Sequence, residues 1–204
     1  IHAVPLAEIE VSPRRYVLAV PARLESSRLP RKLLLAKTGR PLLSHVLENL
    51  QPLRDEADIW LITDHPDLAA VARDLADHTY VSRTPHASGS SRIAEALGDI
   101  EEPWVLNVQG DEPEVKPDDL RSLIARMESQ THAPMGTLAA PFQSEMQWRN
   151  PNAVKVLIST SGRALYFSRS PLPHGGDHQG SHVLHHVGVY AYTWELLANW
   201  SKLP

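Results

Sequence analysis

Four cations lie close together in the segment VPARLESSRLPRK, residues 20–32. Arg23, Arg28, Arg31 and Lys32 surround a Ser-Ser pair, and the segment holds only one acid. An arginine can clamp a phosphate through two parallel hydrogen bonds, while a lysine acts as a compact point charge on phosphate oxygens. The segment therefore suits an anion site, and a solvated loop with surface ion pairs is the alternative interpretation. It is not a Walker loop, because GxxxxGK followed by Ser or Thr does not occur.

A second polar group follows an apolar run in NVQGDEP, residues 107–113. Mg²⁺ is usually held by one or two carboxylates together with substrate phosphates. Asp111 is the carboxylate nearer the end of the run, so we predict it as a metal ligand. A simple turn over residues 110–113 explains the same residues without a metal.

Small residues precede a helical pattern in HASGSSRIAEAL, residues 86–97. The free N–H groups and the dipole at a helix N-terminus favour an anion or a polar base edge, and Arg92 on this helix adds a positive charge. A serine N-cap accounts for most of the same residues. The residues alone leave both interpretations open.

The eleven histidines do not include an HExxH motif. His185 and His186 are adjacent, and a strand would turn their rings to opposite faces, which argues against a shared zinc ion. Tyr190 would share the face of His186, either lining the same pocket or packing in the core. Arg169 ends an apolar run and is either an anion ligand or an edge residue with a buried stem.

Strands and helices alternate along the part of the chain that carries these residues. We predict strands over residues 16–20, 59–63, 79–81, 104–108 and 135–139, and helices over residues 41–50, 66–76, 90–97 and 117–128. This alternation predicts an α/β fold with a mostly parallel sheet, in which ligands bind beyond the carboxyl ends of the strands. PARLESSR, DHPD and QGDEP each follow such a strand, so we expect them to meet at one edge of the sheet.

Short β-rich segments with Gly- and His-rich turns occupy the chain from residue 152 to about residue 192. We expect them to form an antiparallel element that serves as a lid or a dimerisation arm. The length fits a single domain over residues 16–204, and residues 1–15 are predicted to be an N-terminal extension.

The charge and composition narrow the possible partners. Twenty basic and twenty-four acidic residues give a formal charge of −4, which argues against a general nucleic-acid binder. The absence of cysteine excludes disulfides, thiolate nucleophiles and cysteine-bound zinc, and it fits a reducing compartment. The apolar runs are far shorter than the ~18 residues that cross a bilayer. We therefore expect a soluble cytoplasmic protein without nucleic-acid or membrane partners.

Taken together and in order, these segments resemble the 3-deoxy-manno-octulosonate cytidylyltransferase family, the CMP-Kdo synthetases. The resemblance runs from Tyr16 over nearly the whole chain and rests on VPARLESSRLPRKLL, GRPLLSHVLE, ITDHPDL, HASGSSRIAEAL, WVLNVQGDEP, NPNAVKV, ALYFSRSPLP and HHVGVYAY. It implies a nucleotidyltransferase fold with a Rossmann-like sheet, and a homodimer. It also implies transfer of CMP from CTP to the anomeric hydroxyl of 3-deoxy-manno-octulosonate (Kdo), with release of pyrophosphate, for lipopolysaccharide biosynthesis.

The resemblance also assigns site residues by position. It implies six residues around CTP, namely Ala22, Arg23, Lys32, Ser88, Arg92 and Gln109. It implies four residues around the sugar acid, namely Gln109, Arg169, His186 and Tyr190. Arg23 and Lys32 would lie on the phosphates and Asp111 would bind Mg²⁺, the implied cofactor, so these three are the predicted catalytic residues.

Two departures from the family pattern leave alternatives for the function. Ser91 stands where the family usually has an acid, so a carboxylate expected beside Arg92 is missing. After NWSKLP the family continues with an acid-rich segment that carries a second aspartate ligand to the metal, and the sequence does not include this segment. Besides the Kdo enzyme, we keep a cytidylyltransferase for 8-amino-Kdo or another sugar acid, and a catalytically incomplete CTP-binding homologue. The sialic-acid enzymes fit less well, because they favour GSK after PAR.

Overall fold

The structure is a computed structural model that describes residues 16–26, 29–84, 86, 88–98, 100, 103–129, 133–174, 176 and 182–202. The predicted extension over residues 1–15 lies outside the described residues, as do Arg28 and most of the Gly- and His-rich turn at residues 175–181.

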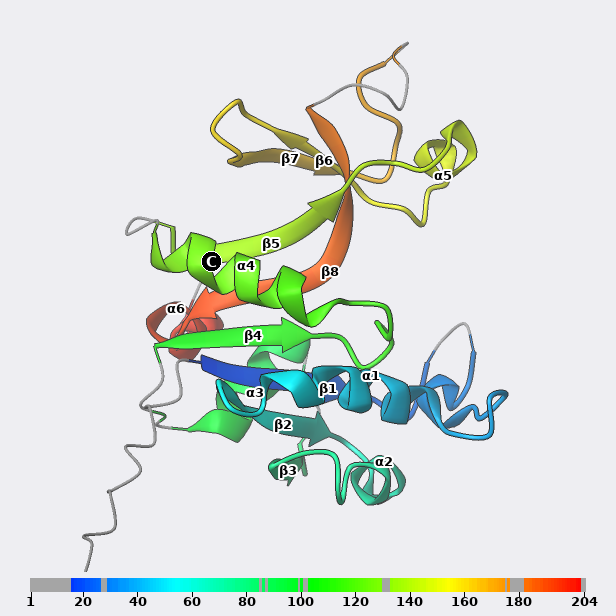
Figure 1. Ribbon diagram of the computed structural model, residues 1–204, viewed down its shortest axis with the longest axis vertical. Helices are drawn as coiled ribbons and strands as arrows, with labels where there is room; N and C mark the ends of the chain where they lie inside the picture. The colour runs from blue at the N-terminus through cyan, green and yellow to red at the C-terminus, as the bar shows by residue number, and fades with distance from the viewer. Residues whose placement is uncertain are drawn as a thin grey trace, which may run out of the picture.

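A mixed sheet forms the centre of the molecule (Figure 1). Its parallel part has the order β3-β2-β1-β4, with β1 (Tyr16–Ala22), β2 (Ala57–Thr63), β3 (His78–Val81) and β4 (Trp104–Val108). β1 is buried along its whole length, and β2 and β4 are almost as deeply buried. Such continuous apolar strands are typical of a parallel sheet that is covered on both faces.

Antiparallel strands extend the sheet beyond β4. The second half of β8 (Val183–Thr193) pairs with β4, and β5 (Met135–Ala140) pairs with the other edge of β8. The predicted α/β fold with a mostly parallel sheet is confirmed. The alternation of strands and helices did not show that β5 would pair with β8, because β8 comes from far along the chain and inserts between β4 and β5.

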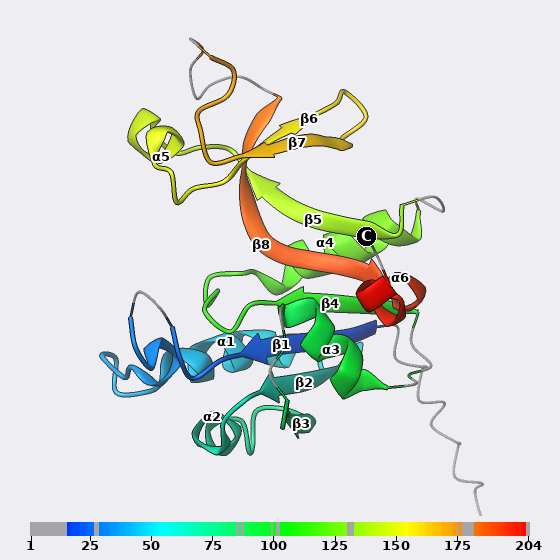
Figure 2. The same ribbon diagram turned by 180° about the vertical axis from the view of Figure 1, so that it is seen from behind.

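Helices cover both faces of the sheet (Figures 1 and 2). They are α1 (Leu42–Leu50), α2 (Pro66–Val71), α3 (Gly89–Leu97), α4 (Pro117–Glu128), α5 (Glu145–Arg149) and α6 (Trp194–Ala198), with 3₁₀ turns η1 (Lys32–Leu34), η2 (Gln51–Leu53) and η3 (Trp200–Lys202). Leu18 and Val20 of β1 pack with α1, α2 and α4, whereas Val17 and Ala19 pack with α3 and α6. This division follows from the two-residue period of a strand. In the described part of the chain, no helix has the length and apolar character needed to cross a membrane.

An arm projects from the main sheet (Figures 1 and 2). Its hairpin of β6 (Lys155–Ile158) and β7 (Ala164–Ser168) pairs through β6 with the first half of β8, and α5 lies nearby. Phe142, Trp148, Ala153 and Val183 form a small separate core there. β8 thus belongs to both parts, because its first half lies in the arm and its second half lies in the main sheet.

Candidate active site

The loops that follow β1 and β4 are in direct contact. Gly110 N donates a hydrogen bond to the Pro21 carbonyl at 3.4 Å. A Cβ at Gly110 would lie 3.3 Å from both this carbonyl and the Leu33 side chain, so the close approach favours glycine here. Ala22, at the end of β1, is buried beside it. The two polar segments that the sequence placed after strands therefore lie together at the carboxyl edge of the sheet.

Lys32 and Asp111 form an ion pair across these two loops, with Nζ 2.7 Å from Oδ2. Both side chains remain about two-fifths exposed, so the pair contributes little to stability and stays accessible to a ligand. An anion at Lys32 would replace the Asp111 carboxylate, and a cation at Asp111 would replace the Lys32 ammonium. A metal-bound phosphate group supplies both replacements at once.

Asp64 connects the loop after β1 to α3. Its Oδ1 accepts a hydrogen bond from Leu24 N at 2.9 Å, and its Oδ2 lies 3.6 Å from Arg92 Nη2. The sequence pattern predicted that the DHPD segment lies at the carboxyl edge of the sheet, but it indicated no function for Asp64. The carboxylate expected beside Arg92 was missing from the sequence pattern, because Ser91 stands where the family usually has an acid. In the structure, the carboxylate of Asp64 lies beside Arg92.

Arg92 is only 3% exposed and lies under the loop after β1. Its Nη1 lies 3.5 Å from the Ala22 carbonyl, and its Nε has no hydrogen-bond partner among the described residues. Burial lowers the pKa of the Arg92 guanidinium, and the carboxylate of Asp64 opposes that shift. Arg23 lies on the exposed side, where its Nη2 donates to the His86 carbonyl at 3.2 Å. The predicted nucleotide residues Ala22, Arg23 and Arg92 are thus grouped at one place.

Ser88 caps α3, which was the alternative interpretation of this segment. Its Oγ accepts from Ser91 N at 3.1 Å, while Ser91 Oγ accepts from Ser88 N at 3.3 Å. Ser91 therefore takes the position that Glu or Gln occupies in the usual capping box. Contact of Ser88 with a nucleotide stays a prediction.

Gln109 and Glu112 lie beside Gly188 of β8, which stands between the part of β8 that pairs with β6 and the part that pairs with β4. Gln109 Nε2 donates to Asn107 Oδ1 at 2.9 Å. A Cβ at Gly188 of β8 would lie 3.6 Å from Glu112 Oε1 and 3.7 Å from Gln109 Cγ. Burial raises the pKa of the Glu112 carboxyl, and the negative charge of Asp111 raises it further. The sequence pattern predicted a turn at Glu112 and no function for its side chain.

His186 and Tyr190 share one face of β8, as their spacing predicted. Their ring centroids are 5.4 Å apart, and Phe167 of the arm meets His186 edge-on at 5.1 Å. His185 points to the other side, where its ring lies 5.5 Å from that of Phe142. The two predicted sugar residues on β8 are therefore neighbours at the junction of arm and main sheet.

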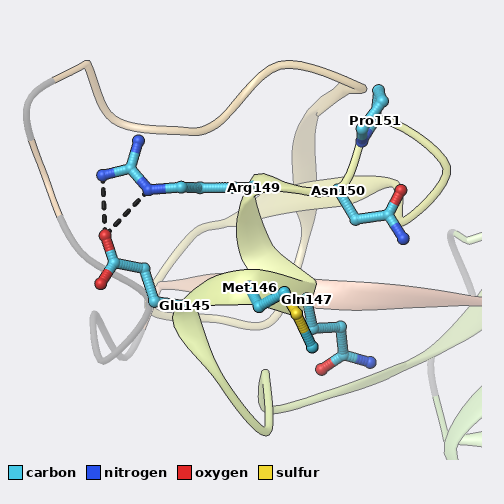
Figure 3. A pocket seen from close by; sticks show the side chains of 6 residues that line it. All are labelled: Glu145, Met146, Gln147, Arg149, Asn150 and Pro151. Atoms are coloured by element: carbon cyan, nitrogen blue, oxygen red, sulfur yellow. Dashed lines mark hydrogen bonds and ion pairs between the residues drawn. The ribbon is translucent and has the colours of Figure 1, made fainter.

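Arg169 lies in the arm, just after β7, and is exposed. Its Nη1 donates to the Pro151 carbonyl at 3.2 Å. Within the described part of the chain it forms no hydrogen bond with the other predicted sugar residues. An open pocket lies beside this carbonyl on α5, lined by Glu145, Met146, Gln147, Arg149, Asn150 and Pro151, with the Arg149–Glu145 ion pair on one side (Figure 3).

Lys155 is fully buried at the base of the arm, and sequence reasoning missed it. Its ammonium donates to the carbonyls of Asn150, Ala153 and Arg169 at 2.8, 2.9 and 3.1 Å. Burial lowers the pKa of this ammonium. Lys155 thereby ties the end of β7, and with it the backbone of Arg169, to the turn before β6. An isolated lysine in NPNAVKV gave no signal of burial beyond its apolar neighbours.

The described residues do not provide a cage of metal ligands. Among them, no group of three or more His, Cys, Asp and Glu side chains lies close enough together to hold an ion. Asp111, opposed by the cation of Lys32 and next to Glu112, instead fits the common magnesium arrangement of one protein carboxylate with substrate phosphates.

Comparisons with known proteins agree with this arrangement. A family model for cytidylyltransferases matches residues 17–201. The chain is 37% identical over 188 residues to the 3-deoxy-manno-octulosonate cytidylyltransferase of Escherichia coli, covering 92% of this chain and 76% of that protein. It is 37% identical over 195 residues to the protein of the same name from Syntrophobacter fumaroxidans, covering 93% of this chain and 78% of that protein.

Solved structures show the same relationship. The structure of a CMP:2-keto-3-deoxy-manno-octonic acid synthetase complexed with CTP is 36% identical, with a TM-score of 0.83 over 93% of this chain and 78% of that chain. A 4-diphosphocytidyl-2C-methyl-D-erythritol synthase from Anaerococcus prevotii is 12% identical, with a TM-score of 0.59 over 91% of this chain and 75% of that chain, and shares the fold alone. Because both the family model and these relatives extend over most of its length, the chain belongs to the 3-deoxy-manno-octulosonate cytidylyltransferase family.

Proposed function

We propose that this protein transfers CMP from CTP to the anomeric hydroxyl of Kdo and releases pyrophosphate. The Lys32–Asp111 ion pair is the observation that carries this proposal. It brings a lysine ammonium and an aspartate carboxylate within 2.7 Å of each other across the two central loops, and these two groups suit a phosphate and a magnesium ion. Membership of the Kdo cytidylyltransferase family and the likeness to a CTP-bound relative support the identity of the two substrates.

The reaction needs positioning and charge neutralisation more than covalent chemistry. The anomeric hydroxyl gives up its proton to solvent as its oxygen attacks the α-phosphorus of CTP. The bond between the α-phosphorus and the oxygen that bridges it to the β-phosphorus breaks, and pyrophosphate leaves with that oxygen. Lys32 and Arg23 bind the phosphates and offset the charge on the leaving group. Asp111 would hold Mg²⁺, which when bound polarises the α-phosphoryl group and lowers the pKa of the attacking hydroxyl. Gln109, His186 and Tyr190 hold the sugar acid on the side of the site that faces away from the CTP phosphates.

A homodimer is part of the proposal, and the arm supplies its surface. Leu165, Tyr166 and Phe167 of β7 are between 45% and 59% exposed, and such adjacent large apolar side chains favour a protein contact. We expect a particle of twice the chain mass in light scattering, and a monomer for Tyr166→Glu. A monomeric wild-type protein contradicts this part. A cytoplasmic location, expected from the cysteine-free composition, also belongs to the proposal.

Pyrophosphate release tests the proposed reaction. The protein is incubated with CTP, Mg²⁺ and Kdo, and pyrophosphate is followed with a coupled assay. We expect release that requires all three, and that falls sharply when CTP is replaced by ATP. Retained CTP binding without release contradicts the reaction and favours a catalytically incomplete homologue. Release that requires 8-amino-Kdo in place of Kdo contradicts only the choice of sugar.

A further inference from the structure

The pairing of β5 with β8 is irregular beside the proposed sugar site. Thr137 lies opposite Tyr190, but the next residue, Leu138, lies opposite Val187. Two residues of β8, Gly188 and Val189, therefore have no partner in β5. Such a bulge interrupts the regular ladder and leaves backbone groups that need other partners.

The Thr137 hydroxyl fills this bulge. Its Oγ1 lies 2.6 Å from the Val189 carbonyl, 3.3 Å from the Val187 carbonyl and 2.9 Å from Nε2 of His186. A hydroxyl has one proton to donate, and a carbonyl can only accept. The contact of 2.6 Å with the Val189 carbonyl requires that proton, since two bare oxygens at this distance would repel each other. Thr137 Oγ1 is therefore left as an acceptor toward His186.

His186 must donate to this acceptor through Nε2. Burial lowers the pKa of the His186 imidazole below its usual value of 6.5, and the neighbouring His185 lowers this pKa further. The ring is therefore neutral at pH values above 6.5. A neutral imidazole carries one N–H and one lone pair, so a proton on Nε2 leaves Nδ1 as an acceptor. Nδ1 has no hydrogen-bond partner among the described residues.

We propose that Thr137 is a positioning residue that fixes His186 as the Nε2–H tautomer, so that Nδ1 is presented to the sugar acid as a hydrogen-bond acceptor. The contribution to sugar binding rests on the proposed function, whereas the tautomer does not. The assignment narrows what His186 can recognise. A lone pair at Nδ1 accepts from a sugar hydroxyl and repels a carboxylate, so His186 selects a hydroxyl of the substrate and the carboxylate is bound elsewhere.

The tautomer can be measured in the unmodified protein. Long-range ¹H–¹⁵N spectra of protein labelled with ¹⁵N-histidine distinguish the two nitrogens, and the signal that is lost in His186→Gln assigns the residue. At pH 7.5 we expect a protonated Nε2 and an unprotonated Nδ1 in the wild type and in Thr137→Ser, and a mixture of tautomers in Thr137→Val. An Nδ1–H tautomer or a doubly protonated ring in the wild type overturns the proposal.

Kinetics test whether this orientation serves the sugar. Thr137→Val keeps the β-branched shape but loses the hydroxyl, and we expect the KM for Kdo to rise about three- to tenfold, as for a lost hydrogen bond, with the KM for CTP unchanged. Thr137→Ser restores the wild-type KM, and Thr79→Val on the exposed edge strand β3 leaves it unchanged. A parallel rise in both KM values, or no rescue by serine, contradicts the positioning function. If the wild type does not turn over Kdo, the proposed function fails, while the spectra still decide the tautomer.

Discussion

The proposed nucleotide side and the proposed sugar side of this site are built in different ways. On the nucleotide side, the loops after β1, β2 and β4 contact one another directly through Lys32, Asp64 and Asp111. On the sugar side, His186 depends on a bulge between two distant strands, and Arg169 depends on a lysine buried in the arm. The parallel sheet brings the first set together because its strand ends share one edge. The second set needs long-range antiparallel pairing as well.

This difference predicts that substitutions on the two sides affect different substrates. Changes at the loops should act on CTP and on the chemical step, whereas changes in the arm and in β5 should act on Kdo.

The largest effect is expected at Asp111. Asp111→Asn removes the proposed metal ligand, and we expect kcat to fall about a hundredfold or more because transition-state charge loses its electrostatic stabilisation. Asp67→Asn is the matched control, since Asp67 also forms an exposed ion pair, with Arg31 at 2.6 Å, but lies outside the proposed site. Pyrophosphate release measures both variants. An equal fall in both, or none at Asp111, contradicts the metal assignment.

Lys155→Met tests the sugar side. Three buried carbonyls lose their shared donor, so we expect the free energy of unfolding to fall by about 2–4 kcal/mol and the KM for Kdo to rise with the KM for CTP unchanged. Urea unfolding and steady-state kinetics measure the two effects. Lys37→Met, at an exposed loop position, serves as the control. A rise in the KM for CTP, with the KM for Kdo unchanged, would contradict the assignment of Lys155 to the sugar side.

Asp64→Asn tests the nucleotide side. The variant keeps an acceptor for Leu24 N but removes the negative charge beside the buried Arg92. We expect the KM for CTP to rise roughly tenfold, as for a lost ion pair between a partly exposed carboxylate and a buried guanidinium, with little change in the KM for Kdo. The ratio of the two KM values measures the effect. Equal changes for both substrates would show that the two sides are coupled.

The smallest effect concerns pH and the sugar side. Burial lowers the pKa of both His185 and His186 below 6.5, so the unfolded chain binds more protons than the folded protein between the folded pKa values and 6.5. The contribution of these two histidines to the free energy of unfolding should therefore be constant above pH 6.5. It should fall as the pH decreases from 6.5 to the pKa values of the folded protein. Melting temperatures between pH 7.5 and 5 measure the slope. We expect His186→Gln to reduce this slope, and an unchanged slope in this variant contradicts the assignment.

Local patterns in the sequence predicted where the loops of the proposed nucleotide side lie. Polar segments after apolar strands indicated that the loops carrying Lys32 and Asp111 would meet at one edge of the sheet, because the carboxyl ends of parallel strands share that edge. The DHPD segment was placed at the same edge, yet the hydrogen bond from Leu24 N to Asp64 depends on a loop conformation that no periodicity encodes.

The sugar side was predictable only in part. The two-residue period of a strand placed His186 and Tyr190 on one face, and the structure agrees. It gave no signal of the bulge at Thr137, because register between strands some fifty residues apart depends on packing rather than on either sequence alone. Nor did it show that Lys155 is buried, because lysines are almost never fully buried and a local pattern does not reveal the three carbonyls that surround this one.

Phosphorus NMR of the complete reaction tests the central claim most directly. Wild-type protein is mixed with CTP, Mg²⁺ and Kdo, and the phosphorus signals are followed over time. We predict that CTP disappears only when Kdo is present, and that pyrophosphate and a sugar-linked CMP phosphodiester appear in equal amounts. Loss of CTP without Kdo, or free CMP in place of the phosphodiester, would contradict the transfer of CMP to the sugar acid at this site.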